Sequence, residues 1–419
     1  MRYLILTDIH ANIDALEAID EPFDRLLFCL TICSLLIATI LGVRSSGALR
    51  PGRTVSTPSA APVASQSSWY FAVSGDSRDC GDVIMPKIAQ TIEHSRAQTP
   101  VEFYWHLGGL RAMGRIDCDI AKRRNPAFQC QPDKRNANEI TAKEKTDYQS
   151  IAWDDFIQHQ VSPFGATPFV LGIGNHELID RTRDDFRLKF KQWLTQPLLE
   201  EQRMADEKKH ISSAAGGTYY HFIKDGVDFI YLDNAGNDYA FSNEQVTWLA
   251  QVLAADAKDK KVKTIIVGMH AALPFSLSRN HAMDASCPGI CSGQRVYNML
   301  YEAQNLSTPP AKRKHVYILA SHSHYYEQNI YDTPEHMGRV LPGWIIGTAG
   351  AEQYRDTIIY GYVQVEVHAD GTIDPQFKEV RRDNPPTDSG PGASELTNFC
   401  FEQNKHPVVD THKSDRRCG

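Results

Sequence analysis

In the stretch TPFVLGIGNHE, residues 167–177, a short apolar run is followed by two glycines and then by Asn175, His176 and Glu177. A run of this length bounded by glycine is typical of a buried strand that ends in a loop. Three other stretches also end an apolar run in a small residue followed by polar ones: WYFAVSGD (69–76) and VKTIIVGMH (262–270) through a glycine, and HVYILASHSH (315–324) through an alanine and a serine. Each of the four predicts a strand whose last residues are polar.

Segments with helical spacing lie between or beside these strands, and the two kinds of segment alternate along the chain. Helices are predicted at 83–95, 148–160, 243–256 and near 293–304. Further strands are expected at 101–109 and 343–350, and Asp-Gly turns predict hairpins at 218–234 and 360–374. We therefore predict an α/β fold with two mixed β-sheets packed as a sandwich flanked by helices. The polar insertion 110–147 is expected to be a surface loop.

Composition excludes several classes of protein. The chain has 419 residues, 42% of them hydrophobic and 23% charged, as expected of a folded globular protein. A net charge of −7 gives no nucleic-acid-binding surface. Short basic clusters, such as Lys122-Arg123-Arg124 and Lys258-Asp259-Lys260-Lys261, are interpreted as solvated surface.

The amino-terminal part contains an uncharged apolar segment at 26–43, which we interpret as a membrane anchor or signal segment. It is preceded by residues 1–25 and followed by a linker rich in Ser, Ala, Pro and Gly at 44–68. The main domain is expected at 69–380, with a loop-like carboxy-terminal tail at 381–419. We expect the chain to be membrane-anchored or exported, with this domain outside the cytoplasm.

The cysteines agree with an oxidising compartment. Cys29 and Cys33 lie within the apolar segment, which leaves an odd number, seven, along the rest of the chain. Cys287 and Cys291 flank a turn and are expected to form a disulfide, and Cys400 could pair with Cys418 in the tail. Half a zinc site is the alternative for the first pair, but no second pair with similar spacing completes it.

Polar residues suited to metal binding follow four of the predicted strands. They are Asp76, Asn175, His176, His270, His322 and His324. Because the carboxyl ends of strands in an α/β fold meet at one edge, these side chains should lie together. Imidazole, carboxylate and amide ligands suit zinc, iron or manganese. His322 and His324 can face the same ion only if they lie on the turn beyond their strand.

The ordered set Asp, Gly-Asn-His-Glu, His and His-x-His resembles the calcineurin-like metallophosphoesterases, over residues 69 to about 350. The resemblance implies a four-layer fold and a two-metal centre (Fe, Mn or Zn) that hydrolyses phosphate mono- or diesters with a metal-activated water. It implies that Asp76 and His324 bind the first metal. The second metal would take Asn175, His270 and His322, and His176 would act as a proton donor or steady the phosphoryl group.

Two positions depart from the family pattern. The family's Asp-x-His motif reads Asp76-Ser77-Arg78 here, and Arg78 cannot bind a metal but could hold a phosphate oxygen. The family's bridging Asp is replaced by Gly109, with Asp79, Asp117 and Asp119 left open as substitutes. We expect at most one tightly held metal, at the second position, and weakened hydrolysis. The alternative is a catalytically inactive metal- or phosphate-binding ectodomain derived from such an enzyme.

The first residues, MRYLILTDIHAN, themselves resemble the first motif of this family through Asp8 and His10. The predicted membrane segment separates them from Gly109, and WYFAVSGD already supplies a first strand. We therefore interpret residues 1–25 as a relic of another copy or as a misplaced start.

Overall fold

The computed structural model describes residues 3–6, 25–28, 68–131, 140–211, 217–236, 238–278, 281–283, 286–305, 313–387 and 389–406. The chain divides into two compact units, Met1–Val63 and Ala64–Gly419. In the first unit, β1 (Tyr3–Leu6) and β2 (Arg25–Phe28) pair in parallel. Residues 29–43 of the predicted membrane segment lie outside the described residues, as do Asp8, His10 and Cys418. Within the described part of the chain, no helix is long and apolar enough to cross a membrane.

The second unit contains a five-stranded mixed sheet, in the order β13-β12-β3-β4-β5. Its strands β3, β4 and β5 are parallel, whereas β12 pairs antiparallel with both β3 and β13. The strand bounds are β3 Trp69–Ser74, β4 Val101–His106, β5 Phe169–Leu171, β12 Tyr360–Val367 and β13 Ile373–Val380.

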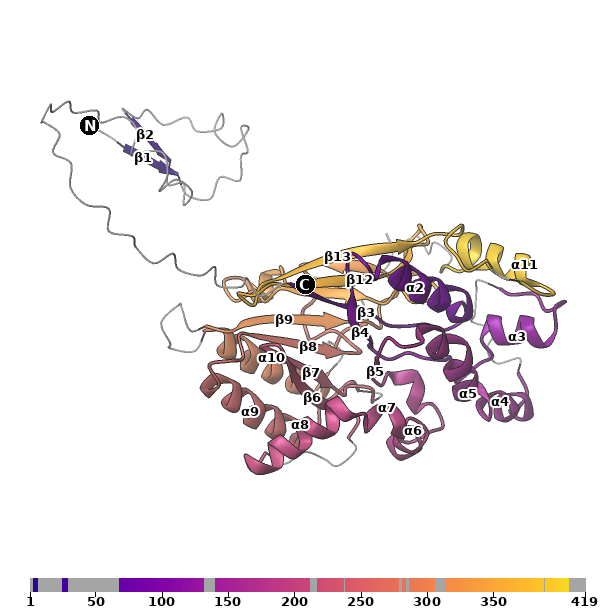
Figure 1. The fold of residues 1–419 in the computed structure, drawn as a ribbon, viewed down its shortest axis with the longest axis horizontal. Helices are drawn as coiled ribbons and strands as arrows, with labels where there is room; N and C mark the ends of the chain where they lie inside the picture. Colours follow the sequence, from indigo (N-terminus) through magenta and orange to yellow (C-terminus); the bar gives the residue numbers. More distant parts are fainter. Residues whose placement is uncertain are drawn as a thin grey trace, which may run out of the picture. The chain divides into compact units, whose positions relative to one another are not determined.

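A six-stranded mixed sheet follows the order β10-β11-β9-β8-β7-β6, with antiparallel pairs at its two ends. Its strand bounds are β6 Tyr220–Lys224, β7 Val227–Leu232, β8 Thr264–Met269, β9 His315–Ala320, β10 Tyr326–Gln328 and β11 Gly343–Ile346. Figure 1 shows the two sheets as successive layers with helices beside them. The predicted α/β sandwich of two mixed sheets is confirmed.

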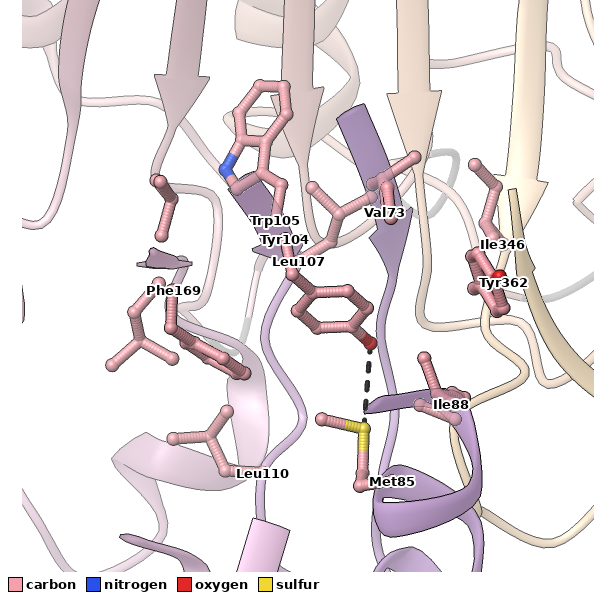
Figure 2. Close-up of a cluster of buried hydrophobic side chains, with 14 of the residues drawn as sticks. Val73, Met85, Ile88, Tyr104, Trp105, Leu107, Leu110, Phe169, Ile346 and Tyr362 are labelled. Carbon is pink, nitrogen blue, oxygen red and sulfur yellow. Dashed lines mark hydrogen bonds between the residues drawn. The ribbon is translucent and has the colours of Figure 1, made fainter. Parts of the chain in front are cut away.

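Five of the six residues of β4, which lies between β3 and β5, are buried, and this explains its mostly apolar sequence. Tyr104 points toward the helix α2 (Gly81–Ser95), where its hydroxyl lies 3.5 Å from the sulfur of Met85 (Figure 2). Trp105 points the opposite way and packs edge-on against Phe229 of the second sheet, with ring centroids 5.8 Å apart. This alternation joins the core between the sheets to the core under the helix.

The helices lie mainly on the outer faces of the sheets. Their bounds are α3 Cys118–Arg124, α4 Ala142–Gln149, α5 Ala152–Phe156, α6 Arg183–Lys189, α7 Lys191–Leu194, α8 Pro197–Lys208, α9 Asn243–Lys258, α10 Gly289–Asn305 and α11 Ala393–Asn398. The helices α9 and α10 cover the second sheet, and their apolar residues form a core with β7, β8 and β9.

Three sequence-based expectations differ from the structure. The insertion 110–147 is not only a surface loop: it contains α3 and the start of α4, and it begins with the buried residues Leu110 and Arg111. The helix expected at 148–160 is α5 followed by a π-helix, Ile157–Val161. The segment after Arg381 contains α11 and a further π-helical turn, Phe399–Gln403.

Three disulfides lie among the described residues of the second unit. Cys287–Cys291 forms as expected, and Cys118–Cys130 joins α3 to the loop that follows it. The expected partner of Cys400 was wrong, because Cys400 bonds Cys80 across 320 positions. This bond attaches the carboxy-terminal segment to the start of α2, next to Asp79 and Arg78.

Candidate functional site

The carboxyl ends of strands from both sheets meet at one edge, as the sequence predicts. The amide of Asp76, just beyond β3, donates to the carbonyl of Gly108 beyond β4 at 2.9 Å. The amide of Ser321, beyond β9, donates to the carbonyl of His270 beyond β8, also at 2.9 Å. The amide of His322 donates to Oδ2 of Asp76 at 2.5 Å and so joins the two sheets. The site therefore lies where the two layers converge.

Arg78 lies between His324, which the resemblance assigns to the first metal, and His176, which it assigns as proton donor. Its Nη2 is 2.6 Å from Nε2 of His324, and its Nη1 contacts Nε2 of His176. The Nδ1 atoms of these two imidazoles face the carbonyls of Glu352 and Ala112, at 2.6 and 2.7 Å. Since a carbonyl accepts only, each Nδ1 carries the proton and each Nε2 accepts from the guanidinium.

Burial and the neighbouring guanidinium keep both imidazoles neutral. Burial, followed by the charge of Arg78, lowers the pKa of His324 to about 4 and holds the pKa of His176 well below its usual value. For Asp76, burial opposes ionisation, but His270 and the guanidinium of Arg78 hold its pKa well below the usual range. The site thus contains an ionised carboxylate beside a fixed arginine cation.

Gly109 leaves no carboxylate where the family's bridging ligand belongs. Its φ of +76° favours glycine, and a Cβ built there would lie 2.3 Å from Oδ1 of Asp76. The carboxylate of Glu177 holds this loop, accepting from the amides of Gly109, Leu110 and Gly174 at 2.9, 2.8 and 2.7 Å. Glu177 is thus a buried structural group that closes the loop around Gly109.

The residues of the second metal position also lie together. His270 Nε2 is 2.9 Å from Oδ1 of Asn175, and its Nδ1 is 3.1 Å from the carbonyl of Leu107. The rings of His270 and His322 have centroids 4.8 Å apart, and Nδ1 of His322 is buried without a hydrogen-bond partner. Over the described ranges, no three His, Cys, Asp or Glu side chains are arranged to hold a metal. The second position combines an amide oxygen with two imidazoles, which are ligand types that zinc, iron and manganese accept.

The three carboxylates that could have replaced the bridging ligand are held by arginines instead. Asp79 forms a two-point pair with Arg115 at 2.7 and 2.8 Å. Asp119 pairs with the fully buried Arg111 at 2.9 and 3.0 Å, and Asp117 lies 3.7 Å from the same guanidinium. None of them therefore supplies a ligand to the position beside Gly109 in this arrangement.

Three rings beside the site were not anticipated from sequence. Tyr354 stacks on His324 with centroids 4.2 Å apart, and its hydroxyl interacts with Arg78. Tyr239 and His281 each lie with ring centroids 5.1 Å from His322. These residues come from separate loops, and no motif marks them in the sequence. Asn175 and His176, by contrast, are partly exposed.

No family model and no curated protein matches this chain. Solved structures similar to it include the purple acid phosphatase PPD1 of yellow lupin (Lupinus luteus) seeds, at 13% identity and TM-score 0.43 over 75% of this chain. The chain spans about half of the lupin protein, 52% of its length. GAP50, the anchor in the inner membrane complex of Plasmodium, is 12% identical at TM-score 0.44, covering 82% of this chain and 98% of that one. A hypothetical protein from Pyrococcus horikoshii is 11% identical at TM-score 0.28, with coverages of 79% and 97%.

Proposed function

We propose that the second unit binds phosphate esters at a metallophosphoesterase-like site in which the guanidinium of Arg78 takes the place of the first metal ion. The observation that carries this proposal is the contact of Arg78 with the Nε2 atoms of both His176 and His324. Those two nitrogens would otherwise be free to face a metal ion or the substrate. The chain would then be the non-catalytic relative of such enzymes rather than an efficient hydrolase.

The chemistry of arginine supports binding over hydrolysis. A guanidinium supplies a permanent positive charge and donors suited to phosphate oxygens, but it does not lower the pKa of a water as a metal ion does. The Nε of Arg78 is buried and makes no hydrogen bond. His176 is neutral and its Nε2 accepts from Arg78, which makes it a poor proton donor.

A metal-dependent phosphoesterase with one metal is the second candidate. The 2.9 Å separation of Asn175 Oδ1 from His270 Nε2 and the unpartnered Nδ1 of His322 favour it. A zinc, iron or manganese ion held by these three residues would supply a Lewis acid for phosphoryl oxygens. Without a bridging carboxylate, hydrolysis of mono- or diesters would be slow.

Metal content, phosphate binding and turnover together test the two candidates. We expect at most one metal per chain by elemental analysis, and binding of inorganic phosphate by calorimetry. The Arg78→Gln variant should lose phosphate binding, whereas Arg381→Gln, a change at an exposed arginine, should keep it. Hydrolysis of p-nitrophenyl phosphate and its diester should stay near the uncatalysed rate. Two metals per chain, or rapid turnover that survives Arg78→Gln, would contradict the proposal.

A further inference from the structure

The edge of the second unit opposite the site is basic. Six cationic side chains, which we call the basic edge, gather there: Lys224, Lys258, Lys260, Lys261, Lys263 and Arg313. They lie near the amino ends of β7, β8 and β9. Backbone hydrogen bonds join these ends: the amide of Lys263 donates to the carbonyl of Gly226 at 2.7 Å, and the amide of His315 donates to the carbonyl of Lys263 at 3.0 Å. Segments separated in sequence thus form one surface.

The charge of this edge is only partly cancelled by neighbouring acidic side chains. Lys258, Lys260, Lys261, Lys263 and Arg313 are all exposed. The acidic side chains among them are fewer: Asp225 and Glu102 pair with Lys224, and Asp259 accepts from the amide of Lys261 through its side chain. Asp370 lies in the neighbouring turn and accepts from Thr372. Cations therefore predominate here, although the whole chain carries a net charge of −7.

The chain also enters the unit at this edge. Trp69 begins β3 and pairs with Val367, and the ammonium of Lys224 lies 5.4 Å from the centre of the Trp69 ring. Asp76 lies beyond the other end of the same six-residue strand. At roughly 3.3 Å per residue, the entry point and the site are about 20 Å apart along the strand.

We propose that the basic edge lies against an anionic phospholipid surface, with the site turned away from the lipid. The apolar segment predicted at 26–43 is joined to Trp69 by about 25 residues, which reach at most about 90 Å when extended. A connection of that length does not by itself decide which face meets the membrane. Charge complementarity selects the basic edge as the face that meets the membrane, because an anionic bilayer attracts lysine and arginine side chains. Substrate would then approach from the solvent side.

Vesicle binding of the Ala64–Gly419 unit tests this inference without the apolar segment. This unit has both sheets, their cores and the three disulfides within its own bounds, so it should fold alone. Each basic residue near the membrane surface contributes roughly 1 kcal/mol to the binding free energy, which corresponds to an affinity about fivefold higher. The triple variant Lys258→Gln, Lys260→Gln, Lys261→Gln should therefore bind phosphatidylserine-containing vesicles on the order of 100-fold more weakly.

The control removes three exposed cations elsewhere: Arg124→Gln, Lys143→Gln and Lys191→Gln. We expect this variant to bind the vesicles like the unchanged unit, and binding of both to fall as salt rises. Pure phosphatidylcholine vesicles should not bind. Equal binding by the two triple variants, no binding of the unchanged unit to anionic vesicles, or binding to soluble heparin alone would overturn the proposal. Phosphate binding at Arg78 should be the same in both variants, which separates this test from that of the proposed function.

Discussion

Replacement of Arg111 by methionine should strongly destabilise the second unit. The Arg111 side chain has no exposed surface, and its guanidinium pairs with Asp119 at 2.9 Å, with Asp82 at 2.6 Å and with Asp155. Methionine would fill much of the space but would leave these carboxylates without their buried cation. Breaking a buried ion pair by removing one partner costs about 3–5 kcal/mol, a large part of the ~5–15 kcal/mol by which a typical domain is stable.

The neighbouring Arg123 provides a matched control, because it pairs with two of the same carboxylates, Asp82 and Asp155. Its side chain is 37% exposed, so water screens the pair and Arg123→Met should lower the free energy of unfolding by no more than about 1 kcal/mol. Urea titration followed by circular dichroism measures both variants. A loss below about 1 kcal/mol for Arg111→Met would refute the argument from burial.

The same measurement has an expected pH dependence. The unfavourable energy in Arg111→Met comes from ionised carboxylates, and burial already raises the pKa of Asp155 to about 6 in the intact cluster. Loss of Arg111 would raise this pKa further, so the deficit of Arg111→Met relative to the unchanged protein should narrow as pH falls toward about 6, where Asp155 of the unchanged protein also takes up its proton. A deficit that stays constant down to pH 4 would show that packing, not charge, dominates.

Three further predictions concern separate parts of the unit. Gly109→Asp alone should lower the free energy of unfolding by about 1–3 kcal/mol and should not raise metal content, because its Cβ would meet Asp76 at a φ of +76°; higher metal content by elemental analysis would contradict this. His221 is buried, which opposes its charge, but Asp228 and Asp206 raise its pKa to about 10. The stability that the charged imidazole contributes should be complete below about pH 6.5 and lost as pH rises toward 10. His221→Gln should remove this pH dependence of the unfolding free energy in urea titrations. Cys400→Ser should lower stability by about 2–5 kcal/mol, because the Cys80 bond closes a loop of 320 positions; unchanged thermal unfolding would refute this.

The order of strands and helices and the residues at the strand ends could be predicted because each depends on local sequence. An apolar run that ends in a small residue and then a polar one describes β3, β5, β8 and β9 without reference to distant parts of the chain. The insertion after β4 could not be predicted in this way. Its charged residues suggested solvent exposure, yet Arg111 and Asp119 are buried because they pair with each other, and Arg111 also pairs with Asp82 on α2 and Asp155 on α5.

The sequence by itself determined the α/β class, the two mixed sheets and the set Asp76, Asn175, His270, His322 and His324 at one edge. It also identified Arg78 and Gly109 as departures, since a change of residue type within a motif is visible without coordinates. Only the tertiary structure decided what Arg78 does there. Its partners His176 and His324 are 98 and 246 positions away, and contacts over such separations depend on how the two sheets pack. The guanidinium lies between those two imidazoles because the strand ends that carry all three residues converge at that edge.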